Sequence, residues 1–292
     1  MDLEGRRESS NVEDRRGMSA GRKAGIGGIG GIIIAGIITL LMGGNIGDVL
    51  QNAGSMGMGM EQQQGTTDPT QFTQEEQELA TFSKKILAGT EDVWSKVFQE
   101  QGLGTYTPPT MVLYTGSTST GCGQGSAQMG PFYCSADQCL YIDLSFFSSM
   151  RKQLGADGDF AYAYVIAHEV GHHVEYLTGT LQKAHQQMSR LSEADANRVS
   201  VRLELLADFY AGVWAHHDNK MFRSLQQGDL EEAIQCAQVI GDDYLQKRAQ
   251  GYDIPESFTH GTSAQRMKWL KLGLQTGDVR YGTTFQQSDA QL

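Results

Sequence analysis

The stretch from residue 160 to residue 173, FAYAYVIAHEVGHH, decides how this chain folds. It opens with apolar and aromatic residues and ends in the pattern H-E-x-x-H. On a helix His168 and His172 lie one turn apart, so both imidazoles face the same point and can bind Zn²⁺. Glu169 is rotated away from that line but can still take a proton from a water molecule that the metal activates. The stretch therefore predicts a buried helix that carries a zinc site.

A catalytic zinc site needs three protein ligands and one open position. No third His follows at the spacing H-E-x-x-H-x-x-G-x-x-H. The next long helical segment contains ELLAD, in which Glu204 and Asp208 are four residues apart and share a face. Glu204 can complete the ligand set, and Asp208 can bind the other ring nitrogen of His168 and fix its tautomer. We therefore predict two antiparallel helices that bring His168, His172 and Glu204 to one zinc ion.

Residues 71–292 are predicted to form one α+β domain that is mostly helical. Helical periodicity and strand-like apolar runs define its elements. The predicted helices cover residues 75–101, 145–154, 159–178, 190–217, 229–250 and 262–274, and the predicted strands cover 110–114, 132–134 and 140–144. Gly89 is a point where the first helix could be interrupted. The Gly/Ser/Thr-rich stretch 116–130 is predicted to be a flexible loop.

Several segments resemble the bacterial neutral zinc metallopeptidases, within the peptidases that use Glu as the third zinc ligand (gluzincins). These segments are GRRESSNVEDRR (5–16), GPFYC (130–134), YIDLSFF (141–147), AHEVGHH (167–173), ELLAD (204–208), GVWAH (212–216) and FTHGTSAQR (258–266). The resemblance implies a membrane-anchored peptidase with a zincin-like domain. Phe209 departs from it, because we expect Cys there in the family.

Peptide hydrolysis needs two further features. An extended edge strand above the site would bind the substrate main chain by β-addition, and we expect Leu140, Tyr141 and Ile142 to lie on it. The oxyanion of the tetrahedral intermediate needs a donor besides zinc. Because related gluzincins place a His after the third ligand, His260 is the predicted donor, with Tyr210 as the alternative. His260 could instead only pack beside a capped helix.

The N-terminal part contains a long uncharged stretch, residues 24–44. As a helix it would span about 30 Å, the thickness of the hydrocarbon core of a bilayer. Four basic residues lie between Arg15 and Lys23, and none follows until Lys84. The positive-inside rule therefore predicts that residues 1–23 are cytoplasmic and that the rest is exported, as in a single-pass protein of the bacterial inner membrane. A cleaved signal peptide and a buried soluble helix are the alternatives.

The four cysteines lie on the side predicted to be exported. An oxidising compartment favours a disulfide bond, and Cys122 with Cys134 brackets the Gly-rich loop, so we predict that pair. Cys139 and Cys236 could pair by elimination, or either could stay free. The departure at Phe209 leaves this second pairing open.

Composition limits the other possibilities. The 292-residue chain has a net charge of −11, which argues against a nucleic-acid partner because phosphate binding needs clustered Lys and Arg. Its four Cys are too few for a disulfide scaffold, and its 36 Gly show no collagen period. Residues 45–70, rich in Gly, Met and Gln, are predicted to be a flexible linker.

These observations predict a zinc-dependent peptidase with Glu169 as the general base, acting on a peptide or protein substrate. One alternative is a metal-stabilised, membrane-tethered binding scaffold with little or no turnover. Glu169 disfavours a scaffold, which has no use for a base beside the metal. A second alternative is a hydrolase of a non-peptide amide of the cell envelope, which would use the same residues.

Overall fold

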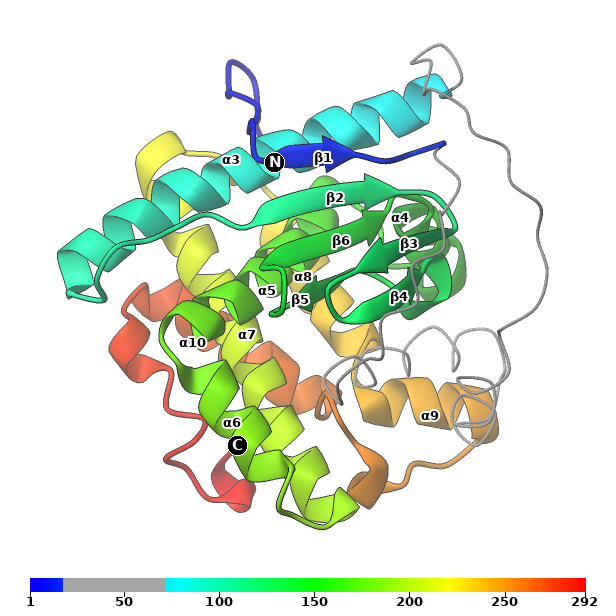
Figure 1. The fold of residues 1–292 in the computed structure, drawn as a ribbon, viewed down its shortest axis with the longest axis vertical. Coiled ribbons are helices and arrows are strands. Elements are labelled where there is room, and N and C mark those ends of the chain that lie inside the picture. The colour runs from blue at the N-terminus through cyan, green and yellow to red at the C-terminus, as the bar shows by residue number, and fades with distance from the viewer. Residues whose placement is uncertain (18–71) are drawn as a thin grey trace.

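The computed structural model describes residues 1–17 and 72–292, and Figure 1 shows their fold. Helices outnumber strands among these residues, so the predicted α+β class with mostly helix is confirmed. The helices are α3 (Gln74–Gln101), α4 (Ser145–Ser149), α5 (Asp159–Leu177), α6 (Thr180–Met188), α7 (Glu193–Phe222), α8 (Asp229–Val239), α9 (Asp242–Gln250) and α10 (Ser263–Thr276). The strands are β1 (Val12–Asp14), β2 (Thr110–Tyr114), β3 (Ser117–Thr120), β4 (Gly123–Ser126), β5 (Phe132–Cys134) and β6 (Cys139–Asp143).

The main sheet has the strand order β1-β2-β6-β5. Strands β1, β2 and β6 run parallel, and β5 runs antiparallel to β6. Because β6 is hydrogen-bonded on both sides, the expectation that Leu140, Tyr141 and Ile142 form an edge strand is wrong. All three side chains are buried, and a strand that is buried on both faces belongs inside a sheet. The edge on this side of the sheet is β5.

Helix α5 is surrounded by other elements. It contacts α3 and β5, and also α7 and α8. Every residue from Phe160 to Glu175 is buried, which explains why this helix is apolar nearly all round instead of along one stripe. Glu232 of α8 accepts a hydrogen bond from the backbone N–H of Phe160 at 3.1 Å and so caps the first turn. The helix that carries H-E-x-x-H is therefore fixed at its start and along its length.

Helices α7 and α10 cross at two glycines. A Cβ atom on Gly273 would overlap the carbonyl oxygen of Phe209, and one on Gly212 would overlap that of Leu270. Glycine lets the two backbones approach this closely, because it has no side chain to keep them apart. The crossing holds α10 against the middle of α7, where the candidate site lies.

Three segments differ from their predicted elements. Residues 229–250 form two helices, because the chain is extended at Gly241, where a Cβ atom would overlap the backbone of Ser263. The stretch 116–130 is not only a loop, since it contains the antiparallel hairpin of β3 and β4. Helix α3 continues through Gly89 without a break.

Residues 1–17 are part of this fold, although residues 1–23 were predicted to be a separate segment. Strand β1 pairs with β2 at the edge of the main sheet (Figure 1). The predicted membrane helix at 24–44 and the predicted linker at 45–70 lie outside the described residues. Within the part that the structure describes, no helix is both long and apolar enough to cross a membrane.

Cys122 and Cys134 form the predicted disulfide bond. The bond ties the turn between β3 and β4 to the end of β5. Cys139, at the start of β6, and Cys236, buried in α8, are both free. The second pairing, left open by the sequence, is therefore not formed.

Candidate metal centre

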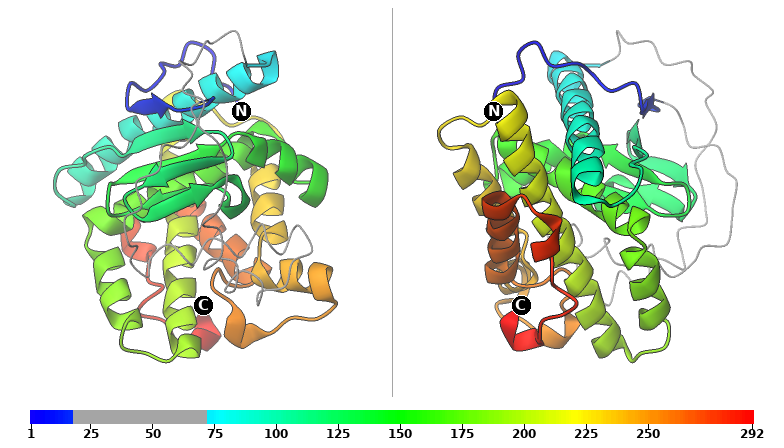
Figure 2. Two further views of the ribbon diagram at one scale, coloured as in Figure 1. Left: turned by 45° about the vertical axis from the view of Figure 1, so that its right-hand side comes forward. Right: turned by 90° about the vertical axis from the view of Figure 1, so that its left-hand side faces the viewer.

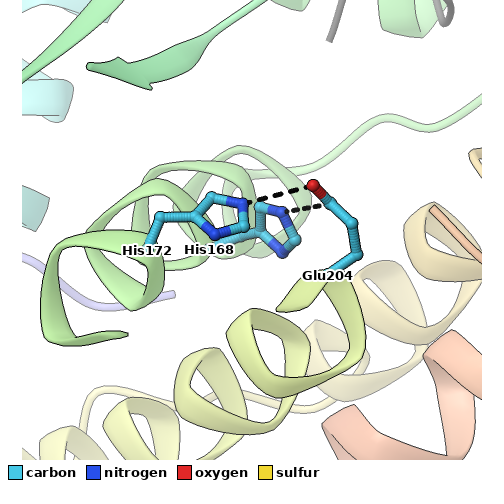
Figure 3. Close-up of side chains that lie close together, drawn as sticks. All are labelled: His168, His172 and Glu204. Carbon is cyan, nitrogen blue, oxygen red and sulfur yellow. Dashed lines mark hydrogen bonds and ion pairs between the residues drawn. The ribbon is translucent and has the colours of Figure 1, made fainter. Parts of the chain in front are cut away.

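Three side chains from two helices meet at one point (Figure 3). His168 and His172 come from α5, and Glu204 comes from α7. The Nε2 atom of His168 lies 3.2 Å from Oε2 of Glu204, and the Nε2 atom of His172 lies 3.5 Å from Oε1. One ligand atom from each of the three residues lies within 4.8 Å of the others. The structure thus brings together the three residues that the sequence proposed as ligands.

Asp208 contacts His168 at the other ring nitrogen. It accepts a hydrogen bond from the Nδ1–H of His168 at 2.8 Å and one from the hydroxyl of Tyr164 at 2.5 Å. Arg266 of α10 donates to both carboxylate oxygens, at 2.8 and 2.9 Å. Burial raises the pKa of Asp208, but the charges of Arg266 and His168 lower it to about 2. Asp208 is thus a charged acceptor that can orient His168, and Arg266 and Tyr164 are partners that the sequence did not predict.

Glu175 makes the equivalent contact with His172. Its Oε2 atom accepts a hydrogen bond from the Nδ1–H of His172 at 2.9 Å. Burial raises the pKa of Glu175 to about 7. The sequence analysis missed this residue, although its i,i+3 spacing from His172 places both on one face of the helix. With both Nδ1 atoms used as donors, both Nε2 atoms remain available to bind a metal.

Glu169 is buried next to the two histidines. Its Oε2 atom has no hydrogen-bond partner among the described residues. Burial is the largest influence on its pKa and raises it, while His168 and His172 oppose the rise. A raised pKa makes the carboxylate a better proton acceptor, which suits a group that takes up a proton and later returns it.

His260 lies in the loop before α10 and is held by Asp242. One oxygen of Asp242 accepts hydrogen bonds from the backbone N–H groups of Thr259, His260 and Gly261, at 2.8, 2.7 and 3.0 Å. The other oxygen lies 3.3 Å from Nδ1 of His260. The Nε2 atom of His260 is buried and has no partner within the described part of the chain. No local sequence pattern marks Asp242, because its contact with His260 depends on how the start of α9 packs against the loop before α10.

The electrostatic field at this centre favours a positive charge. Burial alone would lower the pKa of His168, but Asp208 and Glu204 raise it to about 9. Burial raises the pKa of Glu204, yet His260 and His172 lower it to well below its usual value. Two imidazole nitrogens and one carboxylate oxygen form the ligand set of catalytic zinc sites that keep an open position. The residues therefore fit a zinc ion in donor type, donor number and charge.

Two tyrosines and strand β6 also lie in the region around this centre. Tyr133, on strand β5, has its hydroxyl 2.9 Å from Nδ1 of His173, and so links the sheet edge to α5. Tyr210, the alternative oxyanion donor, is buried against Trp94, with the ring centroids 5.5 Å apart. Strand β6, which carries the predicted substrate residues, lies one strand further inside the sheet than β5.

Comparison with known proteins agrees with this chemistry. A family model described as "Putative neutral zinc metallopeptidase" matches residues 1–285. "Uncharacterized protein YpfJ" of Escherichia coli (strain K12) is 48% identical over 294 residues, covering 99% of this chain and 100% of the relative. "Uncharacterized protein Rv2575" of Mycobacterium tuberculosis is 41% identical over 194 residues, covering 63% of this chain and 64% of that relative. No solved structure matches the chain.

The family match covers both the metal centre and the N-terminal residues that join the sheet. The description of the family agrees with a ligand set of two histidines and one glutamate, which could hold zinc. The chain therefore belongs to the neutral zinc metallopeptidase family.

Proposed function

We propose that this protein is a peptidase that hydrolyses peptide bonds at a single zinc ion held by His168, His172 and Glu204. The observation that supports this proposal best concerns two buried atoms beside the ligands. Oε2 of Glu169 and Nε2 of His260 have no hydrogen-bond partner among the described residues. Most buried polar atoms are hydrogen-bonded, so an unpartnered acid oxygen and an unpartnered ring nitrogen beside a metal centre are candidates for a catalytic role. A metal-stabilised scaffold would give neither atom a use.

Each residue has a defined part in this reaction. When bound, zinc supplies a Lewis acid that polarises the substrate carbonyl and activates water. Glu169 accepts the proton of the attacking water and then donates it to the amine that leaves. Glu204 and Asp242 raise the pKa of His260 against the effect of burial. A hydrogen on Nε2 of His260 can donate to the oxyanion.

We propose β5 as the strand that binds the substrate, in place of β6. Strand β5 is the edge of the sheet next to α5, and its outer backbone groups face away from β6. An extended peptide can add to such an edge through main-chain hydrogen bonds. Two side-chain contacts hold this short strand in place. Tyr133 contacts His173 of α5, and Cys134 forms the disulfide bond with Cys122. This geometry favours a peptide over a non-peptide amide, which has no repeating backbone to pair.

The test is Glu169→Gln in the full chain, compared with Glu231→Gln, which changes an exposed glutamate on α8. Zinc content is measured by metal analysis, and cleavage is measured by mass spectrometry on a proteome-derived peptide library. We expect Glu169→Gln to keep one zinc ion and to lose about 10²–10⁴-fold in rate, the usual contribution of a general base. Glu231→Gln should keep both zinc and activity.

Two outcomes would contradict the proposal. If Glu169→Gln cleaves peptides at the rate of the unchanged protein, Glu169 is not the base. If the zinc-loaded protein cleaves no peptide in the library while chelation unfolds it, the scaffold alternative is favoured.

A further inference from the structure

The N-terminal strap, residues 1–17, is joined to the rest of the protein by backbone pairing. Val12 lies opposite Met111, and Asp14 lies opposite Leu113, in a parallel pair of strands. The backbone N–H of Met111 donates to the carbonyl of Asn11 at 2.9 Å. In the views of Figure 2 the strap begins near the end of α7, passes over α3 and ends in β1. The strap therefore forms the outer strand of the sheet whose other edge is proposed to bind substrate.

Buried polar contacts hold the strap to α3. The hydroxyl of Ser9 and the side-chain amide of Asn11 both donate to Oε1 of Glu91, at 2.5 and 2.7 Å. Arg7 forms an ion pair with the other oxygen of Glu91 at 2.8 Å. Ser9 and Glu91 are each only 6% exposed. Such a network is specific to these partners, because a buried carboxylate is costly unless its oxygens are satisfied.

A second contact joins the strap to α7 and explains Gly89. The guanidinium of Arg6 lies 2.8 Å from Oδ1 of Asp218, whose side chain is 1% exposed. A Cβ atom on Gly89 would come within 2.7 Å of the Arg6 guanidinium and 3.0 Å of the Asp218 carboxylate. The glycine inside α3 therefore makes room for this ion pair, which accounts for a residue that is otherwise unfavourable inside a helix.

We infer from these contacts that the strap and residues 72–292 lie on the same side of any membrane to which the chain is attached. One membrane crossing between them would put β1 and β2 in different compartments, where they could not pair. Two of the basic residues that suggested a cytoplasmic N-terminus are used in the fold. Arg16 is 6% exposed and donates to the carbonyl of Glu76 at 3.0 Å, and Arg15 donates to the carbonyl of Ser119 at 3.1 Å.

The contact of Arg15 also indicates which side this is. Ser119 belongs to the β3–β4 hairpin, and the turn of that hairpin carries Cys122 in its disulfide bond with Cys134. Disulfide bonds persist in oxidising compartments such as the bacterial periplasm. The strap touches the same hairpin, so it shares the compartment in which that bond is kept. The chain between residues 17 and 72 then begins and ends outside the cytoplasm.

Cysteine accessibility in spheroplasts tests this inference on the full chain. The free thiol of Cys139 is removed by Cys139→Ser, and a reporter is placed at one of two exposed positions, Ser10→Cys in the strap or Ala249→Cys in α9. A membrane-impermeant maleimide is added before or after lysis. We expect both reporters to label before lysis, because both positions are inferred to lie outside the cytoplasm. Labelling of one before lysis and of the other only after it would overturn the shared side, and labelling of both only after lysis would overturn the assignment of that side.

Docking of the strap in solution is tested with purified full chain. Gly89→Ala is measured alone and together with Arg6→Ala by thermal unfolding. When Arg6 is present, the added methyl group meets both its guanidinium and the Asp218 carboxylate, so we expect Gly89→Ala to lower the Tm. When Arg6 is truncated, only the approach to Asp218 remains, so the same change should lower the Tm less or raise it, because alanine is the better helix former. An equal change of Tm in both backgrounds would show that the strap is not docked and would overturn the inference.

Discussion

Replacing Arg266 by Met should destabilise the protein strongly. Arg266 is 2% exposed and Asp208 is fully buried, so this ion pair is shielded from water. The pKa of Asp208, about 2 against an ordinary value of 3.8, corresponds to about 2 kcal/mol of stabilisation at neutral pH. The variant loses the share of this amount that Arg266 supplies, since His168 supplies the rest, and also leaves a buried carboxylate without the guanidinium that binds both of its oxygens. We therefore expect a loss of about 3–5 kcal/mol in the free energy of unfolding.

Urea unfolding of the metal-free protein at pH 7 measures this loss. Lys271→Met, an exposed change on the same helix, serves as the control and should stay within about 0.5 kcal/mol. Arg266→Lys keeps the charge but loses the paired geometry, so an intermediate loss is expected. The stability contributed by the low pKa of Asp208 is present above about pH 4 and is lost as the pH falls toward 2. The difference between the unchanged protein and Arg266→Met should therefore shrink over that range. A loss below about 1 kcal/mol at pH 7 would refute this account of the buried pair.

Three further outcomes are expected. Glu175→Gln keeps the shape of the side chain but replaces the carboxyl oxygen that accepts the hydrogen bond from His172, so the zinc dissociation constant in a chelator competition should rise about 10–100-fold; a change below threefold would contradict the orienting role. Gly273→Ala forces a methyl group against the carbonyl oxygen of Phe209, and thermal unfolding should show a loss of about 1–3 kcal/mol or more; an unchanged Tm would mean that the helices can move apart freely. Burial and Asp137 raise the pKa of Cys139 to about 11. Its alkylation rate, followed by mass spectrometry, should therefore rise about tenfold per pH unit from pH 8 to pH 10. A plateau of the rate below pH 9 would contradict the buried setting of this thiol.

The sequence predicted much of the metal centre because that part depends on helix periodicity. His168 and His172 are four residues apart, as are Glu204 and Asp208, so each pair shares a face on any helix. Glu175 is three residues after His172 and also shares its face, so it could have been found in the same way. The contact of Arg266 with Asp208 has no such rule, since it exists only because α10 crosses α7 at two glycines.

The strand predictions were less complete for a related reason. A run of apolar residues such as 140–142 indicates a strand, but it does not say which strands will lie beside it. The pairing of β6 with both β2 and β5, and the addition of β1 from the far N-terminus, are long-range contacts. The sequence indicated a separate segment at residues 1–23, because the buried partners of its polar and charged residues lie on distant elements.

The sequence by itself determined the residues of the candidate metal centre: two imidazoles, a carboxyl group beside them and a carboxylate pair, each placed by spacing along a single helix. Only the tertiary structure decided which strand forms the edge beside the site, which carboxylates hold each histidine, and that residues 1–17 join the main sheet. The physical reason is the range of the interactions. Spacing within a helix follows from backbone geometry alone, whereas sheet order and buried ion pairs follow from how distant segments pack together.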